Sequence, residues 1–304
     1  MTGAAGFIGS HLTARLTELG TEVVGIDNER SGDWSRVTVP CERIEQDLAS
    51  LSVEDLTDAL TGADLCFHLA AEKYNSSQST PQRVIDVNIS ATRRLVDAAA
   101  AAGSPKIVFT SSLYAYGSLG PEPMREADLP APTTTYGMSK VAGEHLLRIG
   151  ERDHGPRWSA ARLFFVYGPR QYAEGGYKSV IVSNFERIRQ GERPTIYGDG
   201  KQSLDYVYVD DVVDALMALG EPANDGALCN LGSGTATSVN DLTDLMVDVA
   251  GADAEPEMCP PDWTAGSVRV ADTSHAATRL AWKSRTPLRE GLRRVWDWME
   301  ASGG

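Results

Sequence analysis

The chain of 304 residues, 42% of them hydrophobic, is long enough to bury a large core in one domain or in two closely packed ones. Its net charge of −14, with arginine far outnumbering lysine, repels nucleic acid and anionic lipid, so we expect neither as a partner. No apolar run reaches about 18 residues and no basic, apolar leader is present, which predicts a cytoplasmic protein without a membrane span.

The chain opens on a glycine-rich turn that contains Gly3, Gly6 and Gly9. Glycines at this spacing allow a tight turn, close approach of a pyrophosphate to the backbone, and tight packing of the helix that we expect over residues 9–19. A plain structural turn is the alternative. Such a turn normally follows a buried strand, yet only Met1 and Thr2 precede it. We therefore expect the native protein to start several residues upstream.

Short apolar strands then alternate with amphipathic helices, a pattern typical of a parallel sheet covered by helices on both faces. The pattern predicts strands at 22–26, 63–68, 106–110 and 159–165, and helices at 81–102 and 136–151.

Asp27 stands at the end of the first of these strands, about 20 residues after the glycine turn. A carboxylate there can accept hydrogen bonds from the hydroxyls of an adenosine ribose and repels a 2′-phosphate. This favours NAD over NADP, whereas the alternative is an ordinary loop aspartate.

Tyr136 and Lys140 lie one helical turn apart, on one face of the predicted helix 136–151. Hydride transfer from an alcohol carbon needs a base for the hydroxyl proton, and free tyrosine, with a pKa of about 10, is a poor base at neutral pH. We expect Lys140, together with a positive nicotinamide ring, to lower the pKa of Tyr136 toward neutral. The alternative is an exposed pair on a helix surface.

The second half of the chain differs in its composition and its pattern of predicted elements. It contains loops rich in glycine and proline at 168–176, 191–200 and 254–266, and helices expected at 212–219 and 239–249. This pattern of long loops and few helices favours a smaller substrate-binding subdomain that is formed from interleaved segments. The four cysteines lack metal-ligand spacing, so we expect reduced, mostly buried thiols and no metal site at Cys41, Cys66, Cys229 and Cys259.

The glycine turn, Thr110-Ser111-Ser112 after an apolar run, and the Tyr136/Lys140 pair resemble, in that order, the extended short-chain dehydrogenase/reductase family. The resemblance covers nearly the whole chain and is strongest to NAD-dependent nucleotide-sugar epimerases such as UDP-glucose 4-epimerase. It implies an α/β fold: a Rossmann-type doubly wound parallel sheet in residues 1–165, to which 203–235 return, and a mixed α/β substrate-binding subdomain from 166–202 and 236–304.

The resemblance also implies roles for individual residues. Ser112 would hydrogen-bond the reacting substrate oxygen, with Ser111 less directly involved, and Lys140 would also bind the nicotinamide ribose. The implied cofactor contacts are Gly3, Gly6, Phe7, Ile8, Gly9, Asp27, Asn28, Asp47, Leu48, Leu69, Ala70, Ala71, Lys73, Asn88, Tyr136, Lys140 and Phe164. The implied substrate contacts are Ser112, Tyr114, Phe165, Lys178, Asn184 and Arg269; for Asn184 the start of a surface helix is the alternative.

The residues that follow Ser112 narrow the reaction. Dehydratases that resemble this chain carry an Asp-Glu pair there to expel water, and decarboxylating relatives carry a glutamate, whereas this chain has Leu113-Tyr114. The resemblance therefore implies reversible oxidation at C4 of a UDP- or dTDP-sugar. The 4-keto intermediate would turn in the site and take the hydride back on its other face, with NAD kept bound.

The chain departs from the family pattern on the substrate side. The family's asparagine near the nucleotide phosphates is Phe165 here, and the arginine before Asp205 is Leu204. A second phosphate arginine is absent from 263–267. Arg170, Lys178 and Arg269 remain as cations. Two alternatives therefore stay open: a dehydrogenase or reductase of a non-nucleotide alcohol or sugar, and a non-catalytic NAD-binding protein.

Helices equivalent to 81–102 and 136–151 form a four-helix interface in relatives, so the resemblance implies a homodimer. Two histidines near the cofactor positions, His11 and His68, are expected to pack rather than react.

Overall fold

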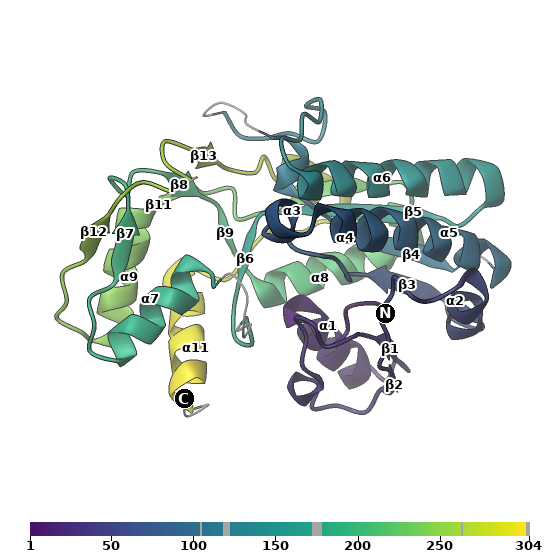
Figure 1. The fold of residues 1–304 in the computed structure, drawn as a ribbon, viewed down its shortest axis with the longest axis horizontal. Helices are drawn as coiled ribbons and strands as arrows, with labels where there is room; N and C mark the ends of the chain where they lie inside the picture. The colour runs from purple at the N-terminus through teal and green to yellow at the C-terminus, as the bar shows by residue number, and fades with distance from the viewer. Residues whose placement is uncertain (104, 118–121, 172–177, 263, 302–304) are drawn as a thin grey trace.

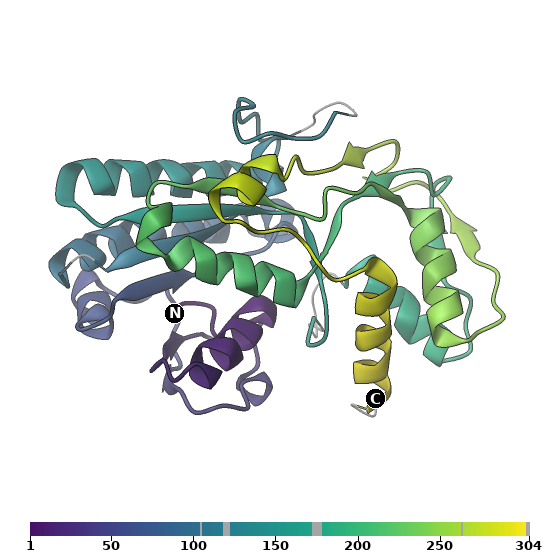
Figure 2. The same cartoon turned by 180° about the vertical axis from the view of Figure 1, so that it is seen from behind.

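The computed structural model describes residues 1–103, 105–117, 122–171, 178–262 and 264–301, and it forms a larger and a smaller part that lie side by side (Figures 1 and 2). The predicted loops at 168–176 and 254–266 are described only in part, because residues 172–176 and Trp263 lie outside these ranges.

The larger part is built on a parallel sheet. Its strands are β1 (Val24–Ile26), β2 (Glu42–Ile44), β3 (Leu65–His68), β4 (Lys106–Ser112), β5 (Trp158–Leu163) and β10 (Leu228–Leu231). One group has the order β10-β5-β4-β3 and the other pairs β1 with β2, all in parallel. This arrangement confirms the predicted fold class.

Thr2 joins the two groups of strands. It bridges Ile26 of β1 and His68 of β3, and its N–H donates to the carbonyl of Phe67 at 2.9 Å. The central position of the sheet is thus held by a single bridging residue, which places Gly3 at the carboxyl edge of the sheet next to β1 and β3.

Helices cover both faces of this sheet, as Figure 1 shows. On one side lie α2 (Val53–Leu60), α5 (Thr92–Ala101) and α6 (Thr135–His154), and on the other lie α1 (Phe7–Glu18) and α8 (Val209–Gly220). Side chains of β4 alternate between two buried clusters: Ile107 and Phe109 pack with the first set of helices, and Val108 packs with the second. The sheet is therefore buried on both faces, which explains its continuous apolar strands.

Two predicted elements are divided in the structure. The helix expected over 81–102 consists of α4 (Pro81–Ile85), a π-helical segment η2 (Asp86–Ala91) and α5. The strand expected over 159–165 ends at Leu163, and β6 (Phe165–Tyr167) leaves the sheet to pair in parallel with β9 (Tyr206–Tyr208). From β6 onward the chain passes from the larger into the smaller part.

In the residues that the structure describes, the smaller part combines short strands with three helices. The strands are β7 (Thr195–Tyr197), β8 (Ser203–Leu204), β11 (Thr237–Ser238), β12 (Glu257–Cys259) and β13 (Val268–Arg269), and the helices are α7 (Val180–Arg189), α9 (Val239–Ala250) and α11 (Leu288–Ala301). Leu242 of α9, Phe185 of α7 and Val295 of α11 share one buried cluster. The shorter helices and turns are η1 (Trp34–Arg36), α3 (Ser76–Ser79), η3 (Leu113–Ala115), η4 (Pro222–Asn224) and α10 (Ser274–Arg279).

α10 lies away from the other late elements. It packs against β10, and Ala276 and Trp282 join the buried cluster beneath α1 and α8. All four cysteines are free thiols, with Cys66 and Cys229 buried. Among the described helices, none has the length and apolar character that crossing a membrane requires. The described residues also contain no group of His, Cys, Asp and Glu side chains able to hold a metal ion.

Candidate active site

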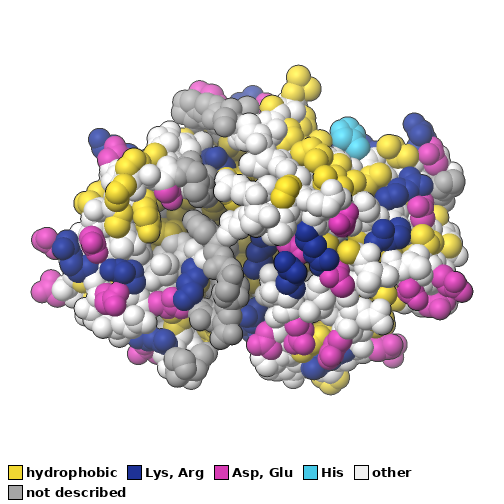
Figure 3. Space-filling model, viewed as in Figure 1, with side chains coloured by type: hydrophobic (Ala, Val, Ile, Leu, Met, Phe, Trp, Pro, Cys, Tyr) yellow, Lys and Arg dark blue, Asp and Glu magenta, His cyan; other side chains and the backbone are white. Residues whose placement is uncertain are grey.

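A cavity of about 810 Å³ lies between the two parts, and Figure 3 shows the molecule hollowed there. Its wall contains nearly all of the site residues predicted from sequence: Gly3, Gly6, Phe7, Ile8, Gly9, Asp27, Asn28, Asp47, Leu48, Leu69, Ala70, Ala71, Lys73, Ser112, Tyr114, Tyr136, Lys140, Phe164, Phe165, Lys178 and Asn184. Asn88 and Arg269 are not part of the wall. The roles of these residues remain predictions, but their convergence on one cavity is observed.

The glycine turn forms one end of the cavity. Gly3 has a φ of +72°, and a Cβ there would lie 2.7 Å from the backbone nitrogen of Ala70. A Cβ on Gly9 would lie 2.0 Å from the carbonyl oxygen of Gly3, so α1 packs directly on the turn. α1 begins at Phe7, and its N-cap, Gly6, has no side chain to bond the first N–H groups of the helix. This end therefore suits the phosphates of a dinucleotide.

Asp27 lies beside this turn, at the end of β1. It is 9% exposed, and its carboxylate accepts hydrogen bonds from the N–H groups of Ala5 at 3.0 Å and Glu29 at 2.8 Å. Burial raises the pKa of Asp27 against the opposing effect of these bonds. A carboxylate fixed in this way can still accept from ribose hydroxyls, so the residues at this end fit a dinucleotide cofactor.

Asn88 supports the cofactor end from behind the wall. Its Oδ1 accepts the N–H of Glu72 at 2.8 Å, and its Nδ2 donates to the Glu72 carbonyl at 3.1 Å and to Ser139 Oγ at 3.0 Å. It therefore ties the loop after β3 to α6. Its side chain is 2% exposed.

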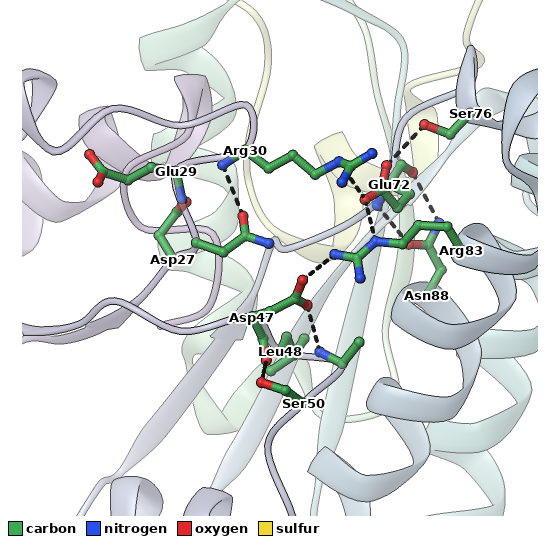
Figure 4. A network of polar contacts seen from close by, with 12 residues as sticks. Asp27, Glu29, Arg30, Asp47, Leu48, Ser50, Glu72, Ser76, Arg83 and Asn88 are labelled. Carbon is green, nitrogen blue, oxygen red and sulfur yellow. Dashed lines mark hydrogen bonds and ion pairs between the residues drawn. The ribbon is translucent and has the colours of Figure 1, made fainter.

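Sequence reasoning missed four charged residues at the same end of the wall: Arg30, Arg36, Glu72 and Arg83. Among them, Arg30, Glu72 and Arg83 form a network with Asp47 (Figure 4). The one sequence signal that could have shown Glu72 is a charged residue directly after the Leu69-Ala70-Ala71 strand end.

The proposed catalytic residues come from two elements that meet in the middle of the cavity. Thr134 caps α6 by accepting the N–H of Gly137 at 3.1 Å, which places Tyr136 in the first turn and Lys140 in the next. Lys140 Nζ donates to the Thr110 carbonyl at 2.8 Å and lies 5.6 Å from the ring centre of Tyr136. Ser112, at the end of β4, lines the same cavity as Tyr136, and its Oγ accepts the N–H of Tyr114 at 3.3 Å.

Burial dominates the proton affinities of this pair. It raises the pKa of Tyr136 to about 12, against the opposing effect of Ser112, and it lowers the pKa of Lys140 to about 7, against the negative charge of Glu144. Among the protein's own groups, removal of the phenolate from water thus outweighs the favourable contacts; the lowering expected from Lys140 together with a positively charged nicotinamide ring stays a prediction.

Ser111 also lines the cavity, but its hydroxyl is bound by the protein. Its Oγ donates to Glu144 at 2.5 Å, and Glu144 also binds Arg162 through two hydrogen bonds of 2.9 Å and 2.8 Å. Arg162 and Glu144 are both almost fully buried. This network anchors α6 to β4 and β5.

Tyr114 forms the wall next to Tyr136. Its ring stacks on Tyr74 with 4.6 Å between ring centres and meets the ring of Tyr136 edge-on at 5.8 Å. The guanidinium of Arg269 lies 5.3 Å from the centre of the Tyr114 ring. Arg269 is therefore not itself in the wall, but it contacts Tyr114, which is.

Two other predicted substrate residues have protein partners. Asn184, 1% exposed within α7, donates to the carbonyl of Thr195 at 3.0 Å and accepts its N–H at 2.9 Å. Lys178 pairs with Glu186 at 2.7 Å. The amide of Asn184 therefore holds β7 against α7.

The two histidines pack as expected. His11 is hydrogen-bonded to Asp210 at 3.1 Å and to the carbonyl of Pro169 at 3.0 Å. His68, 1% exposed, is hydrogen-bonded to Thr2 at 2.7 Å and to Thr92 at 2.8 Å.

Comparison with known proteins gives one consistent result. The profile of the NAD dependent epimerase/dehydratase family matches residues 1–232. The chain is 37% identical over 301 residues to a UDP-glucose 4-epimerase of Mycolicibacterium smegmatis, covering 96% of this chain and 95% of that protein.

Solved structures agree with the sequence comparison. A UDP-glucose 4-epimerase of Thermotoga maritima, solved with UDP-glucose, superposes with a TM-score of 0.91 at 33% identity, over 99% of this chain and 98% of that one. A UDP-glucuronic acid 4-epimerase of Bacillus cereus, solved with UDP-glucuronic acid and NAD, gives 0.88 at 28% identity, over 99% and 98%.

Proposed function

The chain belongs to the NAD dependent epimerase/dehydratase family and uses NAD as its cofactor, and from this we propose that it inverts C4 of a nucleotide sugar through a transient 4-keto intermediate. The observation that carries the proposal is the convergence of Ser112, Tyr136 and Lys140 in the middle of one cavity. One end of that cavity has the glycine turn and Asp27, and the other is lined by the smaller part.

The cofactor end is formed by this chain's own residues. The N-terminus of α1 would hold the pyrophosphate, and Asp27 the adenosine ribose. When bound, NAD supplies a hydride acceptor for C4, a hydride donor for the return step and a positively charged ring.

The protein's residues move the proton. Tyr136 Oη takes the proton of the C4 hydroxyl and later returns it to the oxygen of the opposite epimer, so the enzyme is unchanged after each cycle. Ser112, which lines the cavity with Tyr136, holds the reacting oxygen. Lys140, buried one turn along α6, would act together with the positively charged ring of NAD to offset the burial of Tyr136 and favour a phenolate.

The residues after Ser112 favour epimerisation over elimination. Leu113 is 2% exposed, and Tyr114 places a neutral ring against Tyr136. Neither side chain is a carboxylate that could remove a proton from C5 and expel water.

The direct test follows the C4 configuration by NMR. The protein is incubated with UDP- and dTDP-sugars, without added cofactor, and the 4-epimer of at least one sugar is expected. We expect Tyr136→Phe to lose roughly a hundred- to ten-thousandfold in kcat while it keeps its bound NAD. Turnover retained by this variant would refute the role of Tyr136.

A second candidate is oxidation of an alcohol or sugar that carries no diphosphate. The smaller part lines one side of the cavity. Among the described residues of that side, Lys178 is the cation, and it is bound to Glu186. Leu204 on the same side is apolar and Asp262 is acidic. Diphosphates are usually held by charge-assisted hydrogen bonds, which this wall offers sparingly. Net formation of NADH, without any 4-epimer, would establish this second reaction.

A further inference from the structure

Four charged side chains from four separate segments meet at one end of the cavity (Figure 4). Glu72, which follows β3, lies at their centre. Its Oε1 accepts a hydrogen bond from Arg83 Nε of α4 at 2.9 Å and lies 3.3 Å from Arg30 Nε in the loop after β1. Arg83 also pairs with Asp47, which follows β2. The ion pairs therefore join loops that would otherwise be independent edges of the cavity.

One side of this network is rigid. Asn88 bonds both the N–H and the carbonyl of Glu72, and Ser76 Oγ donates to Glu72 Oε2 at 2.9 Å. The Glu72 side chain is only 10% exposed. Its position is therefore set by β3, α3 and the π-helical segment, whether or not Arg30 is bound to it.

The other side of the network is an exposed arm. The side chain of Arg30 is 57% exposed and extends from the loop after β1 toward Glu72, as Figure 4 shows. Because an exposed ion pair is weak, Arg30 can leave Glu72 without disturbing the packed part of the wall.

The location of the network gives it a function. Arg30 follows Asp27 and Asn28, and Asp47 precedes Leu48, so the network lies at the end of the cavity wall assigned to the adenosine. The reacting residues lie in the middle of the cavity. An adenosine group that entered or left at this end would pass close to the Arg30–Glu72 pair.

We propose that Arg30, Glu72 and Arg83 form a clasp that opens for NAD to exchange and otherwise retains it. An enzyme that restores NAD in every cycle needs no exchange during turnover, and a clasp at the adenosine end slows loss of the cofactor without affecting the reacting groups. The inference goes beyond the proposed function, because cofactor exchange requires no sugar.

The test measures exchange rates on the intact protein. NADH serves as the fluorescent probe: its binding is followed after mixing, and its release after displacement by excess NAD. Arg30→Gln removes the exposed arm, and Arg93→Gln is the matched control, since Arg93 pairs with Asp97 on the surface of α5, outside the cavity wall. Arg83→Gln is the second variant, and melting curves confirm that each variant is folded.

A clasp changes both rate constants in the same direction. We expect Arg30→Gln to raise the association and dissociation rate constants by about fivefold each, with Kd changed by less than about twofold. High salt should accelerate release from the wild type and have little effect on the variant. The Arg93→Gln control should behave as the wild type.

Two results would overturn the proposal. If dissociation alone accelerates and Kd weakens in proportion, Arg30 is an ordinary ligand contact and no clasp. If neither rate constant changes in Arg30→Gln or Arg83→Gln, NAD exchanges by another route.

Discussion

His68 should make this protein lose stability in mild acid, because its burial and its present hydrogen bonds favour the neutral imidazole. Thr92 Oγ1 donates to the carbonyl of Asn88 at 2.8 Å, so His68 Nε2 must carry the proton in the 2.8 Å bond to Thr92. Nδ1 then accepts from Thr2 Oγ1, which also receives the N–H of Ala70. A second proton on His68 would point at Thr2 Oγ1, which would have to give up the hydrogen bond that it donates to Nδ1 and accept instead, beside the N–H of Ala70.

The magnitude follows from the shift of its proton affinity. Burial, with smaller contributions from Lys140 and the N-terminus, lowers the pKa of His68 from 6.5 to about 3. The unfolded chain therefore binds more protons than the native protein below pH 6.5, so stability falls as the pH falls. At 1.36 kcal/mol per pKa unit, going from about pH 7.5 to about pH 5 costs about 2 kcal/mol from this residue alone.

The assay compares urea unfolding of wild type and His68→Asn at these two pH values. The variant should be about 1–3 kcal/mol less stable at the higher pH, because it loses a buried hydrogen bond. Between the two pH values, however, it should lose about 2 kcal/mol less than the wild type. His275→Gln, an exposed histidine on α10, controls for the loss of a histidine at any site and should keep the wild-type acid sensitivity.

An equal acid sensitivity in wild type and His68→Asn would refute this reasoning. It would mean that His68 is protonated in the folded protein, or that carboxylates elsewhere account for the whole effect.

Three further substitutions test the site and the residues that support it. Gly3→Ala should lower the free energy of unfolding, measured in thermal melts, by more than about 3 kcal/mol, because a Cβ would clash with Ala70 and the positive φ is strained. Gly20 also has a positive φ but open space around it, so Gly20→Ala should lower the free energy of unfolding by only about 1 kcal/mol. Asp27→Ala should weaken NAD binding roughly tenfold by titration and narrow the preference for NAD over NADP; unchanged selectivity would contradict its role. Glu144→Gln should cost about 3–5 kcal/mol in chemical unfolding, since it leaves the charge of Arg162 buried without a carboxylate, and a near-neutral result would show that the pair is dispensable.

The spacing of residues along a helix or strand was the information in the sequence from which site residues could be placed together. Tyr136 and Lys140 share a helix face because residues one turn apart always do, and the structure places both in the cavity wall. Asp27 follows the end of β1, Ser112 is the last residue of β4, and Gly3 follows the bridging residue Thr2. The carboxyl ends of parallel strands meet at one edge of a sheet, so these three residues lie at the same edge. Apolar strands alternating with helices were therefore enough to predict a parallel sheet covered on both faces, whereas most residues of the cavity wall were predicted from the family resemblance.

Element boundaries within continuous apolar segments could not be found in this way. The divided helix over 81–102 and the break at Phe164 leave no mark in hydrophobic periodicity, since the residues on both sides remain apolar or helical in pattern. They depend on which neighbours each segment meets: Phe165 pairs with Tyr206, from a distant part of the chain.

Only the tertiary structure decided the properties that depend on three-dimensional surroundings. Arg30, Glu72 and Arg83 meet although they belong to different loops, and no local pattern links them. The protein's own groups raise the pKa of Tyr136 because the phenol is buried, and burial depends on every group around it, while the sequence shows only its helical neighbour. Asn184 faces Thr195 for the same reason: a side chain's partners are chosen by the packing of distant segments, whereas its position along a helix or strand follows from the backbone alone.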